Sequence, residues 1–310
     1  MRIVSLLPSA TEIICALGLE DQLVGVTHEC DFPPSVRRLP KVTRTLIPTD
    51  ASSATIDSLV REERRADRSL YALDLPVLEA LSPDLIVTQT LCDVCAVSDD
   101  EVRAAACTLP GATRVLHLEP TTLPEVLSSI EAVAQAAGIE DRGREVVRHL
   151  QARIDAVTGK QTGAARRPRV ALLEWLDPPF SCGHWSPAIV RLAGGVEGLG
   201  VEGQRSRMLT WNEVIVWRPE IVVIACCGFT VERTLEDVPV VEGVSGWQGI
   251  PAARGGAVYV VDGSSYFSRP GPRLVESLEL LAHIIDPAAH ALPSGIPAPV
   301  RVETRQLAGS

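Results

Sequence analysis

Short apolar runs recur along this chain, and a polar or glycine-containing segment follows each of them. The runs are rich in valine, isoleucine and leucine, as is typical of strands that are buried on both faces of a parallel sheet. The predicted strands are Ile3–Leu7, Leu23–Thr27, Leu85–Gln89, Val115–Leu118, Val170–Glu174, Ile221–Ala225 and Ala257–Val261.

Between these strands, apolar residues recur at three- and four-residue spacing, which predicts amphipathic helices. Ser9 or Thr11 is expected to cap the first helix, because a hydroxyl there can accept a hydrogen bond from the first turn. The predicted helices are Glu12–Leu17, Val77–Leu81, a helix opened by Ser98–Glu101, Ala188–Ala193, Thr210–Val216 and Arg273–Ile285. Strands that alternate with helices in this way predict an α/β fold.

The longest helical pattern covers residues 121–158, with strand-like runs on both sides and none inside it. Thr121 and Thr122 offer N-cap oxygens, and Gly138 interrupts the pattern. We therefore predict two Rossmann-like lobes with parallel sheets, joined by a long backbone helix. The predicted domains are the N-terminal lobe 1–120, the connecting helix 121–158, the C-terminal lobe 159–290 and a loose tail, 291–310.

In parallel sheets, ligands bind beyond the carboxyl ends of the strands. Six strand ends, called the lip segments below, carry most of the less common side chains of this chain. The lip segments are residues 8–11, 28–30, 89–93, 174–180, 226–229 and 262–267. We expect them to hold a ligand in a cleft between the two lobes.

The composition argues against several classes of function. The 310 residues are 46% hydrophobic and 22% charged, which is typical of a folded globular chain. A net charge of −10 and a pI of about 5.2 argue against a nucleic-acid partner. No apolar run is long enough for a membrane span, and the residues after Met1 lack the pattern of an export signal. We therefore expect a cytoplasmic location, and the eight cysteines agree with it, because thiols need not pair in a reducing compartment.

Ordered motifs accompany the alternating pattern. Arg2–Glu12 reads RIVSLLPSATE, and one helix-to-strand signature occurs twice, at Ser82–Val87 and Arg218–Val223. Asp177–Gly183 follows the first strand of the second lobe and reads DPPFSCG. In this order the motifs resemble the cobalamin-type periplasmic substrate-binding proteins of ABC transporters, the class with a helical backbone.

This resemblance implies a non-catalytic protein that holds a small-molecule ligand between two lobes with little hinge closure. Cobalamin or a related corrinoid is the expected ligand. A corrin is a broad, mostly apolar disc with an amide fringe, so its site needs flat aromatic surfaces and hydrogen-bonding groups. The predicted ligand-binding residues are Pro8, Ser9, His28, Glu29, Gln89, Trp175, Phe180, Phe229, Tyr266 and Phe267.

Two features differ from exported members of the family. We expect the protein to lack their export signal, because the residues after Met1 are predicted to form a strand. Members that dock on a permease carry an acidic residue on each lobe. Glu213 matches this residue on the second lobe, and Glu79 is the nearest acid on the first. An ABC permease is thus a candidate partner, but a cytosolic protein that binds or delivers its ligand fits the sequence better.

A metal site is an alternative interpretation of the same lip segments. His28 and Cys30 follow one predicted strand and Cys92 and Cys95 follow another, so these four residues could bind a soft metal ion. In the simpler interpretation, His28 hydrogen-bonds a loop and the cysteines pack as small apolar side chains. Cys92 and Cys95 could also form a redox pair.

Three hypotheses of function follow. The first is binding of cobalamin or a related corrinoid. The second is a cytosolic protein that binds a metal or a metal chelate such as haem, a siderophore or zinc, and the third is an enzyme that uses the lip cysteines. The sequence contains no Walker A or GxSxG motif, so a P-loop nucleotide-binding or hydrolase function lacks support, and the family resemblance implies no enzymatic activity.

Overall fold

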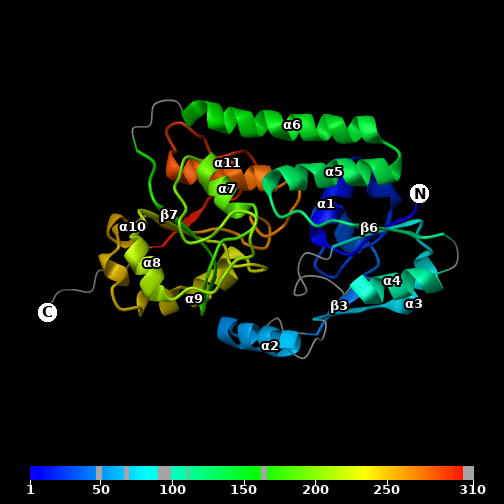
Figure 1. The fold of residues 1–310 in the computed structure, drawn as a ribbon, viewed down its shortest axis with the longest axis horizontal. Helices are drawn as coiled ribbons and strands as arrows, with labels where there is room; N and C mark the ends of the chain where they lie inside the picture. Colours follow the sequence, from blue (N-terminus) through cyan, green and yellow to red (C-terminus); the bar gives the residue numbers. More distant parts are fainter. Residues whose placement is uncertain (47–50, 66–69, 90–98, 110–111, 162–165, 303–310) are drawn as a thin grey trace. The chain divides into compact units, whose positions relative to one another are not determined.

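The computed structural model describes residues 1–46, 51–65, 70–89, 99–109, 112–161 and 166–302 (Figure 1). The chain divides into two compact units. Unit 1 consists of Met1–Pro120, Pro124–Leu150 and Pro270–Pro272, and unit 2 consists of Thr121–Leu123, Gln151–Arg269 and Arg273–Ser310.

A four-stranded parallel sheet forms the centre of unit 1, in the order β2-β1-β5-β6. Its strands are β1 (Ile3–Ser5), β2 (Leu23–Gly25), β5 (Leu85–Thr88) and β6 (Arg114–His117). Every residue of β1 and β5 is buried, as the apolar runs predict. The helices before α5 are α1 (Pro8–Ala16), α2 (Ser53–Arg65), α3 (Leu75–Leu81) and α4 (Asp99–Thr108), and an antiparallel pair, β3 (Thr43–Thr45) and β4 (Tyr71–Leu73), lies outside the sheet.

Helix α1 begins earlier than predicted. Pro8 occupies the first turn, where its missing N–H costs nothing, and Leu7 is an N-cap without a side-chain hydrogen bond. The prediction that Ser9 or Thr11 caps this helix is therefore wrong. Both residues lie inside the helix and are buried, and the Thr11 hydroxyl donates to Ser5 Oγ at 2.9 Å, which ties α1 to β1.

The connecting block consists of two helices rather than one. α5 (Leu123–Ala137) ends at Gly138, which has a φ of +72°, and α6 (Glu140–Thr158) runs back beside it (Figure 1). A Cβ on Gly143 would lie 2.6 Å from the Ala134 Cβ, so the glycine permits close packing of the two helices. One of the boundaries between the units falls after Leu150, inside α6.

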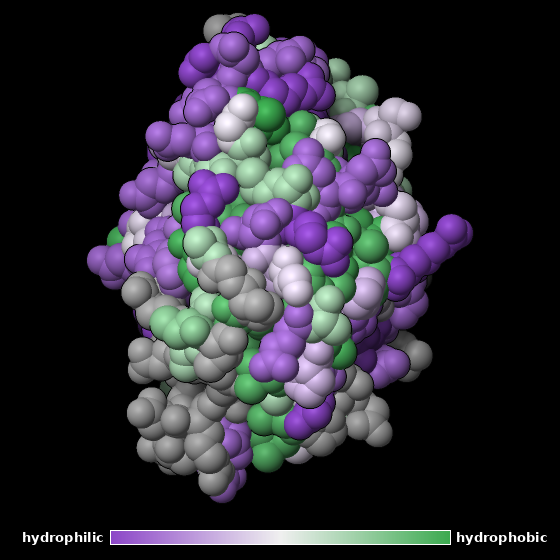
Figure 2. Space-filling view, turned by 90° about the vertical axis from the view of Figure 1, so that its right-hand side faces the viewer, coloured by the Kyte–Doolittle hydropathy of each residue, from purple (hydrophilic) through white to green (hydrophobic). Residues whose placement is uncertain are grey.

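The outer surface of α6 is strongly charged. Arg142 pairs with Glu145 and Arg144 pairs with Asp141, and all four side chains are exposed. In Figure 2, hydrophilic residues gather at the upper end of the view, where α6 lies in Figure 1. The helix thus shows the polar outer face and apolar inner face that the spacing of its apolar residues predicts.

Unit 2 contains a five-stranded sheet in the order β11-β10-β9-β7-β8. The three central strands are parallel, and both edge strands are antiparallel to their neighbours. The strands are β7 (Val170–Leu176), β8 (Pro179–Ser181), β9 (Ile221–Ile224), β10 (Val258–Val260) and β11 (Val300–Arg301). The helices are α7 (Ser186–Leu192), α8 (Trp211–Trp217), α9 (Val231–Glu242), α10 (Pro251–Gly255) and α11 (Leu274–Ile285). Short 3-10 helices cover Glu20–Gln22, Pro34–Arg38, Gly159–Gln161 and Trp247–Gly249.

Both edge strands of unit 2 were missed by the sequence analysis. β8 pairs with β7 within a segment that was predicted to be a lip loop. β11 lies in the predicted loose tail, where Val300 pairs with Val260, and the Arg301 guanidinium donates to the carbonyls of Gly255 and Gly256. Within the predicted tail, Val300–Arg301 therefore form an edge strand of the sheet.

The predicted fold class is confirmed: the chain is α/β, and each unit has a parallel sheet at its centre. Helix α9 was not predicted, because Pro239 and several acidic residues interrupt its apolar pattern. Among the described residues, no helix combines the length and apolar character that a membrane span requires.

Candidate functional site

A polar cluster follows β2 in unit 1. His28 Nδ1 lies 2.8 Å from Thr43 Oγ1, and the His28 backbone N–H donates to the same oxygen at 3.3 Å. The Tyr71 ring lies 5.2 Å from the His28 ring, and the Tyr71 hydroxyl donates to Glu29 Oε1 at 2.9 Å. Because Thr43 and Tyr71 come from β3 and β4, this antiparallel pair fixes two predicted site residues. We call His28, Glu29, Thr43 and Tyr71 the His28 cluster.

The electrostatic environment of His28 favours its neutral form. Burial lowers the pKa of the imidazole, and the nearby Lys41 ammonium also lowers it, whereas the Glu29 carboxylate raises it.

Thr43 and Tyr71 were not predicted as site residues. The signal that could have identified Thr43 is weak, since it depends on pairing between β3 and β4, which are far apart in the sequence.

The other predicted ligand residues of unit 1 offer less surface. Ser9 is 2% exposed and Gln89 is 7% exposed. Pro8 is half-buried and is fixed as the first residue of α1. Of the predicted binding residues in unit 1, His28 and Glu29 therefore offer the more accessible polar atoms.

The predicted metal ligands are only partly described by the structure. Cys30 is 2% exposed, and its thiol lies 3.1 Å from both Thr11 Oγ1 and Thr27 Oγ1. Cys92 and Cys95 lie outside the described residues. Within the described ranges, no group of three histidine, cysteine, aspartate or glutamate side chains is arranged to hold a metal ion. A bare metal site at His28 and Cys30 thus stays a prediction.

An aromatic cluster lies at the ends of β7, β8 and β9 in unit 2. Trp175 is opposite Phe180 in the sheet register, and the Trp175 ring lies 4.7 Å from the Phe229 ring. The register shifts between Leu173 and Trp175, and the Trp175 indole N–H donates to the Asp177 carbonyl at 3.1 Å. Trp175 and Phe180 are half-buried and Phe229 is 9% exposed, so the first two rings offer a surface to a ligand.

Arg233 extends the aromatic cluster and was not predicted. Its guanidinium carbon lies 4.4 Å from the centre of the Phe229 ring, a cation–π distance. The same guanidinium lies 3.1 Å from Asp237 and 3.6 Å from Glu236. The four-residue spacing of Arg233 and Asp237 is a helical ion-pair signal, but it was missed because α9 was not recognised.

Tyr266 and Phe267 do not join this surface. Tyr266 is 6% exposed and Phe267 is 1% exposed. The Phe267 carbonyl accepts a hydrogen bond from the Trp185 indole at 2.6 Å, and its backbone N–H donates to Ser277 Oγ. In this structure both rings are packing residues of unit 2, and a role in ligand contact stays a prediction.

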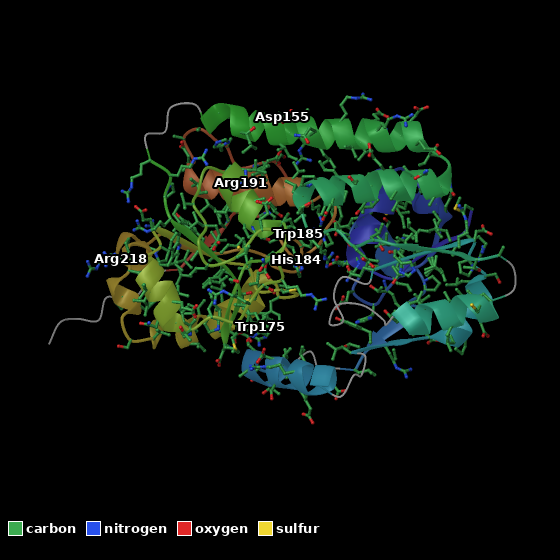
Figure 3. The ribbon with its side chains drawn as sticks, viewed as in Figure 1. Asp155, Trp175, His184, Trp185, Arg191 and Arg218 are labelled. Atoms are coloured by element: carbon green, nitrogen blue, oxygen red, sulfur yellow. The ribbon has the colours of Figure 1, made fainter. Side chains whose placement is uncertain are left out.

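The segment after β8 contains further buried polar groups. Figure 3 labels Trp175, His184 and Trp185, which all belong to unit 2. His184 has a φ of +51°, its ring lies 5.3 Å from the Trp185 ring, and its Nε2 atom is buried without a hydrogen-bond partner. Burial, and then the charge of Arg205, lower the pKa of His184.

Glu174 precedes Trp175 and is partly enclosed by the same segment. Its Oε1 atom accepts a hydrogen bond from the Gly183 N–H at 3.2 Å. Burial raises the pKa of this carboxyl to about 7, although the bonds from Gly183 and Ser206 lower it. The carboxyl next to the aromatic cluster therefore takes up or releases a proton near neutral pH.

Glu213, the candidate permease contact, is already bonded within unit 2. Its carboxylate accepts from the Thr210 backbone N–H at 2.7 Å and from Arg207 at 2.8 Å, completing a capping box at the start of α8. The Thr210 backbone bond, followed by the Arg207 bond, lowers its pKa to about 2. The group stays charged and solvent-accessible, but its first role is to begin the helix.

Two α/β units with parallel sheets, and with polar and aromatic side chains at their strand ends, define a solute-binding type of protein. Residues 3–264 match the periplasmic binding protein family, and the chain belongs to this family. Relatives of the chain include proteins described as an ABC transporter substrate-binding lipoprotein and as vitamin B12-binding proteins. Membership of this family makes the chain a binding protein of the periplasmic binding protein type.

Two curated relatives resemble the chain over most of its length. An uncharacterised ABC transporter substrate-binding lipoprotein of Bacillus subtilis is 25% identical over 292 residues, covering 92% of this chain and 80% of the relative. A vitamin B12-binding protein of Vibrio cholerae is 23% identical over 282 residues, covering 90% of this chain and 86% of the relative.

Among solved structures, a periplasmic haem-binding protein of Pseudomonas aeruginosa has a TM-score of 0.72 with 19% identity. The match covers 98% of this chain and 99% of that protein. At this identity the likeness establishes the fold, and it does not distinguish a corrin from a haem as the ligand.

Proposed function

We propose that this protein is a non-catalytic binding protein for cobalamin or a related corrinoid. The observation that carries the proposal is the aromatic cluster, in which the Trp175 ring is fixed by its bond to Asp177 and Phe180 lies beside it. Flat, half-buried rings that are held in one orientation suit the apolar face of a macrocycle. The vitamin B12-binding protein of Vibrio cholerae supports this choice as a relative in sequence.

The charges near both clusters favour an amide fringe over a carboxylate fringe. Glu29 is exposed and carries a negative charge beside His28, where it can accept hydrogen bonds from amide N–H groups. Arg233, the cation at the aromatic cluster, is paired with Asp237 and Glu236. A carboxylate beside His28, and a cation that is already paired at the aromatic cluster, would each be poor partners for the propionates of a haem.

Titration separates this proposal from its alternatives. The protein is titrated with cyanocobalamin, haemin, a ferric siderophore and zinc chloride in one buffer, and tryptophan fluorescence and visible absorption are recorded. We expect cyanocobalamin to bind most tightly and to quench Trp175. Haemin or the siderophore binding more tightly would instead support the alternative function, which is binding of a metal chelate.

A pair of variants tests the role of the aromatic cluster. Trp175→Ala removes the ring and is expected to weaken cyanocobalamin binding about tenfold, which corresponds to roughly 1.4 kcal/mol. Trp175→Phe keeps an aromatic surface and is the matched control, with an expected change below about threefold. Equal affinity of Trp175→Ala and the unaltered protein would remove the observation on which the proposal depends.

Three further predictions belong to this proposal. They are a ligand position between the two lobes, a cytoplasmic location and an ABC permease as partner. Fractionation of cells followed by detection of the full-length chain tests the location. Co-purification with a permease, compared between the unaltered protein and Glu213→Ala, tests the partner.

A further inference from the structure

His28 has the second-sphere support that is typical of a metal ligand. A ligating histidine usually uses one ring nitrogen for the metal and the other for a hydrogen bond that fixes the ring. In this chain Nδ1 is held 2.8 Å from Thr43 Oγ1, and the backbone N–H of the same residue donates to that oxygen. Two hydrogen bonds to one buried hydroxyl fix both the backbone and the ring.

The bonding of Thr43 is consistent with a free Nε2 lone pair. A hydroxyl oxygen has two lone pairs, so Thr43 Oγ1 can accept from the backbone N–H and from Nδ1–H at once. In the tautomer that this bonding allows, the proton of the neutral imidazole is on Nδ1 and Nε2 is the acceptor. No described residue forms a hydrogen bond with Nε2.

Tyr71 and Glu29 restrict the imidazole from another side. The two rings lie 5.2 Å apart at an interplanar angle of 42°. The Tyr71 hydroxyl is fixed in turn by its 2.9 Å bond to Glu29 Oε1. Since His28 is only half-buried, a ligand can approach the ring without displacing the groups that support it.

The neighbouring thiol does not share this arrangement. Cys30 Sγ is buried between Thr11 and Thr27, each 3.1 Å away. A bare zinc ion needs three or four protein ligands, and the described part of the chain contains no such group. A metal ion that a macrocycle already holds in its plane needs only one axial ligand from the protein.

Taking these observations together, and resting on the proposed function, we propose that His28 Nε2 is the axial ligand of the metal at the centre of a tetrapyrrole. Binding is a ligand exchange: Nε2 forms a bond to the metal, and the water or base that occupied that axial position leaves. No electron is transferred. The preferred substrate class is therefore a metal macrocycle with an exchangeable axial position, rather than a metal-free ring or a free metal ion.

Electron paramagnetic resonance of bound cob(II)alamin tests this directly. A single axial ¹⁴N ligand splits each cobalt line into three, and a ¹⁵N ligand splits it into two. The full-length protein is prepared with ¹⁵N-labelled histidine and mixed with unlabelled cob(II)alamin. We expect doublets, which show that a histidine nitrogen has replaced the ligand's own base. Triplets with binding intact would overturn the inference and leave the proposed function standing.

Variants assign the signal to one histidine. His28→Ala should abolish the doublets and weaken binding at least about tenfold, whereas His149→Ala changes an exposed histidine of α6 and should leave both unaltered. Thr43→Val removes the bond to Nδ1 and should weaken binding by about tenfold while the doublets persist, because it affects only the orientation of the ring. Doublets that persist in His28→Ala would contradict the assignment.

A haem titration completes the test. If cobalamin does not bind and haemin does, the proposed corrinoid function fails. The inference about His28 then depends on the haem spectrum, which should show a nitrogen-ligated iron in the unaltered protein and lose it in His28→Ala. Binding of neither macrocycle would overturn both proposals.

Discussion

At the scale of single residues, Glu174 makes stability depend on pH. Its pKa is raised from 4.5 to about 7 in the folded protein. Between these values the unfolded chain has lost the proton that the folded chain keeps, so the stabilising contribution of this carboxyl is largest below pH 4.5 and is lost as the pH rises through 7. The loss attributable to this carboxyl is at most about 3 kcal/mol.

Glu174→Gln removes this titration and keeps an oxygen to accept the Gly183 N–H bond. Between pH 5 and pH 8, we expect the free energy of unfolding to fall by up to about 3 kcal/mol less in this variant than in the unaltered protein. Urea unfolding at both pH values measures the difference. Glu62→Gln, at an exposed position of α2, is the matched control. If Glu174→Gln and the unaltered protein respond equally to pH, the raised pKa is refuted.

The residue scale also shows where sequence reasoning succeeds. Trp175, Phe180 and Phe229 were predicted from their positions after apolar runs, and the structure brings them together because strand ends of one sheet share an edge. Arg233 and Thr43 were missed because their contacts depend on an unrecognised helix and on pairing of distant strands. Burial of Tyr266 and Phe267 depends on side-chain packing, which spacing does not determine.

At the scale of elements, close backbone contacts hold the segment around β8. A Cβ on Gly183 would lie 2.2 Å from the Ser206 N atom and 2.7 Å from the Arg205 carbonyl carbon. We expect Gly183→Ala to displace this backbone and to lower the free energy of unfolding by roughly 2–4 kcal/mol. Gly249→Ala is the matched control, because nothing lies within 4 Å of its added Cβ. Denaturant unfolding of Gly183→Ala and Gly249→Ala compares the two positions. Equal unfolding midpoints would show that the backbone around Gly183 can shift to accept a Cβ without loss of stability.

The end of β11 supports the end of α10. The Arg301 guanidinium donates to the Gly255 carbonyl at 2.9 Å and also to the Gly256 carbonyl. Arg301→Ala removes both charge-assisted bonds and should cost about 1 kcal/mol of stability, since water replaces part of the interaction. Arg254→Ala, at an exposed position of α10, should cost less. Thermal unfolding of both variants gives the comparison, and a larger loss from Arg254→Ala would contradict the role of β11.

Elements with a long apolar pattern were predicted well, and edge elements were not. β1, β5 and β9 are buried throughout and β7 is buried over its first four residues, so apolar side chains occupy both faces of these strands. β8 and β11 have only two or three residues, and they are strands because a neighbouring strand provides hydrogen-bond partners. Their own residues contain too little periodicity to show this pairing.

At the scale of the whole molecule, the course of the chain links the two units covalently. Between its ends the chain passes from one unit to the other after Pro120, Leu123, Leu150, Arg269 and Pro272. The passage after Leu150 lies inside the continuous helix α6. Unit 2 also fixes the later part of this helix, because Arg153 forms two hydrogen bonds with Glu279 of α11, at 2.9 and 2.7 Å. Loss of either unit would therefore remove the packing of one half of α6.

We consequently expect the protein to unfold in one cooperative transition, with equal calorimetric and van't Hoff enthalpies. Arg148→Pro places a helix breaker at an exposed position close to the boundary and should cost about 3 kcal/mol. If α6 couples the unfolding of unit 1 to that of unit 2, this variant should also broaden the unfolding transition or split it in two. Arg148→Ala is the control, because it removes the same side chain and keeps the helix. Two separate transitions in the unaltered protein would show that each unit is stable alone and that the shared helix does not couple them.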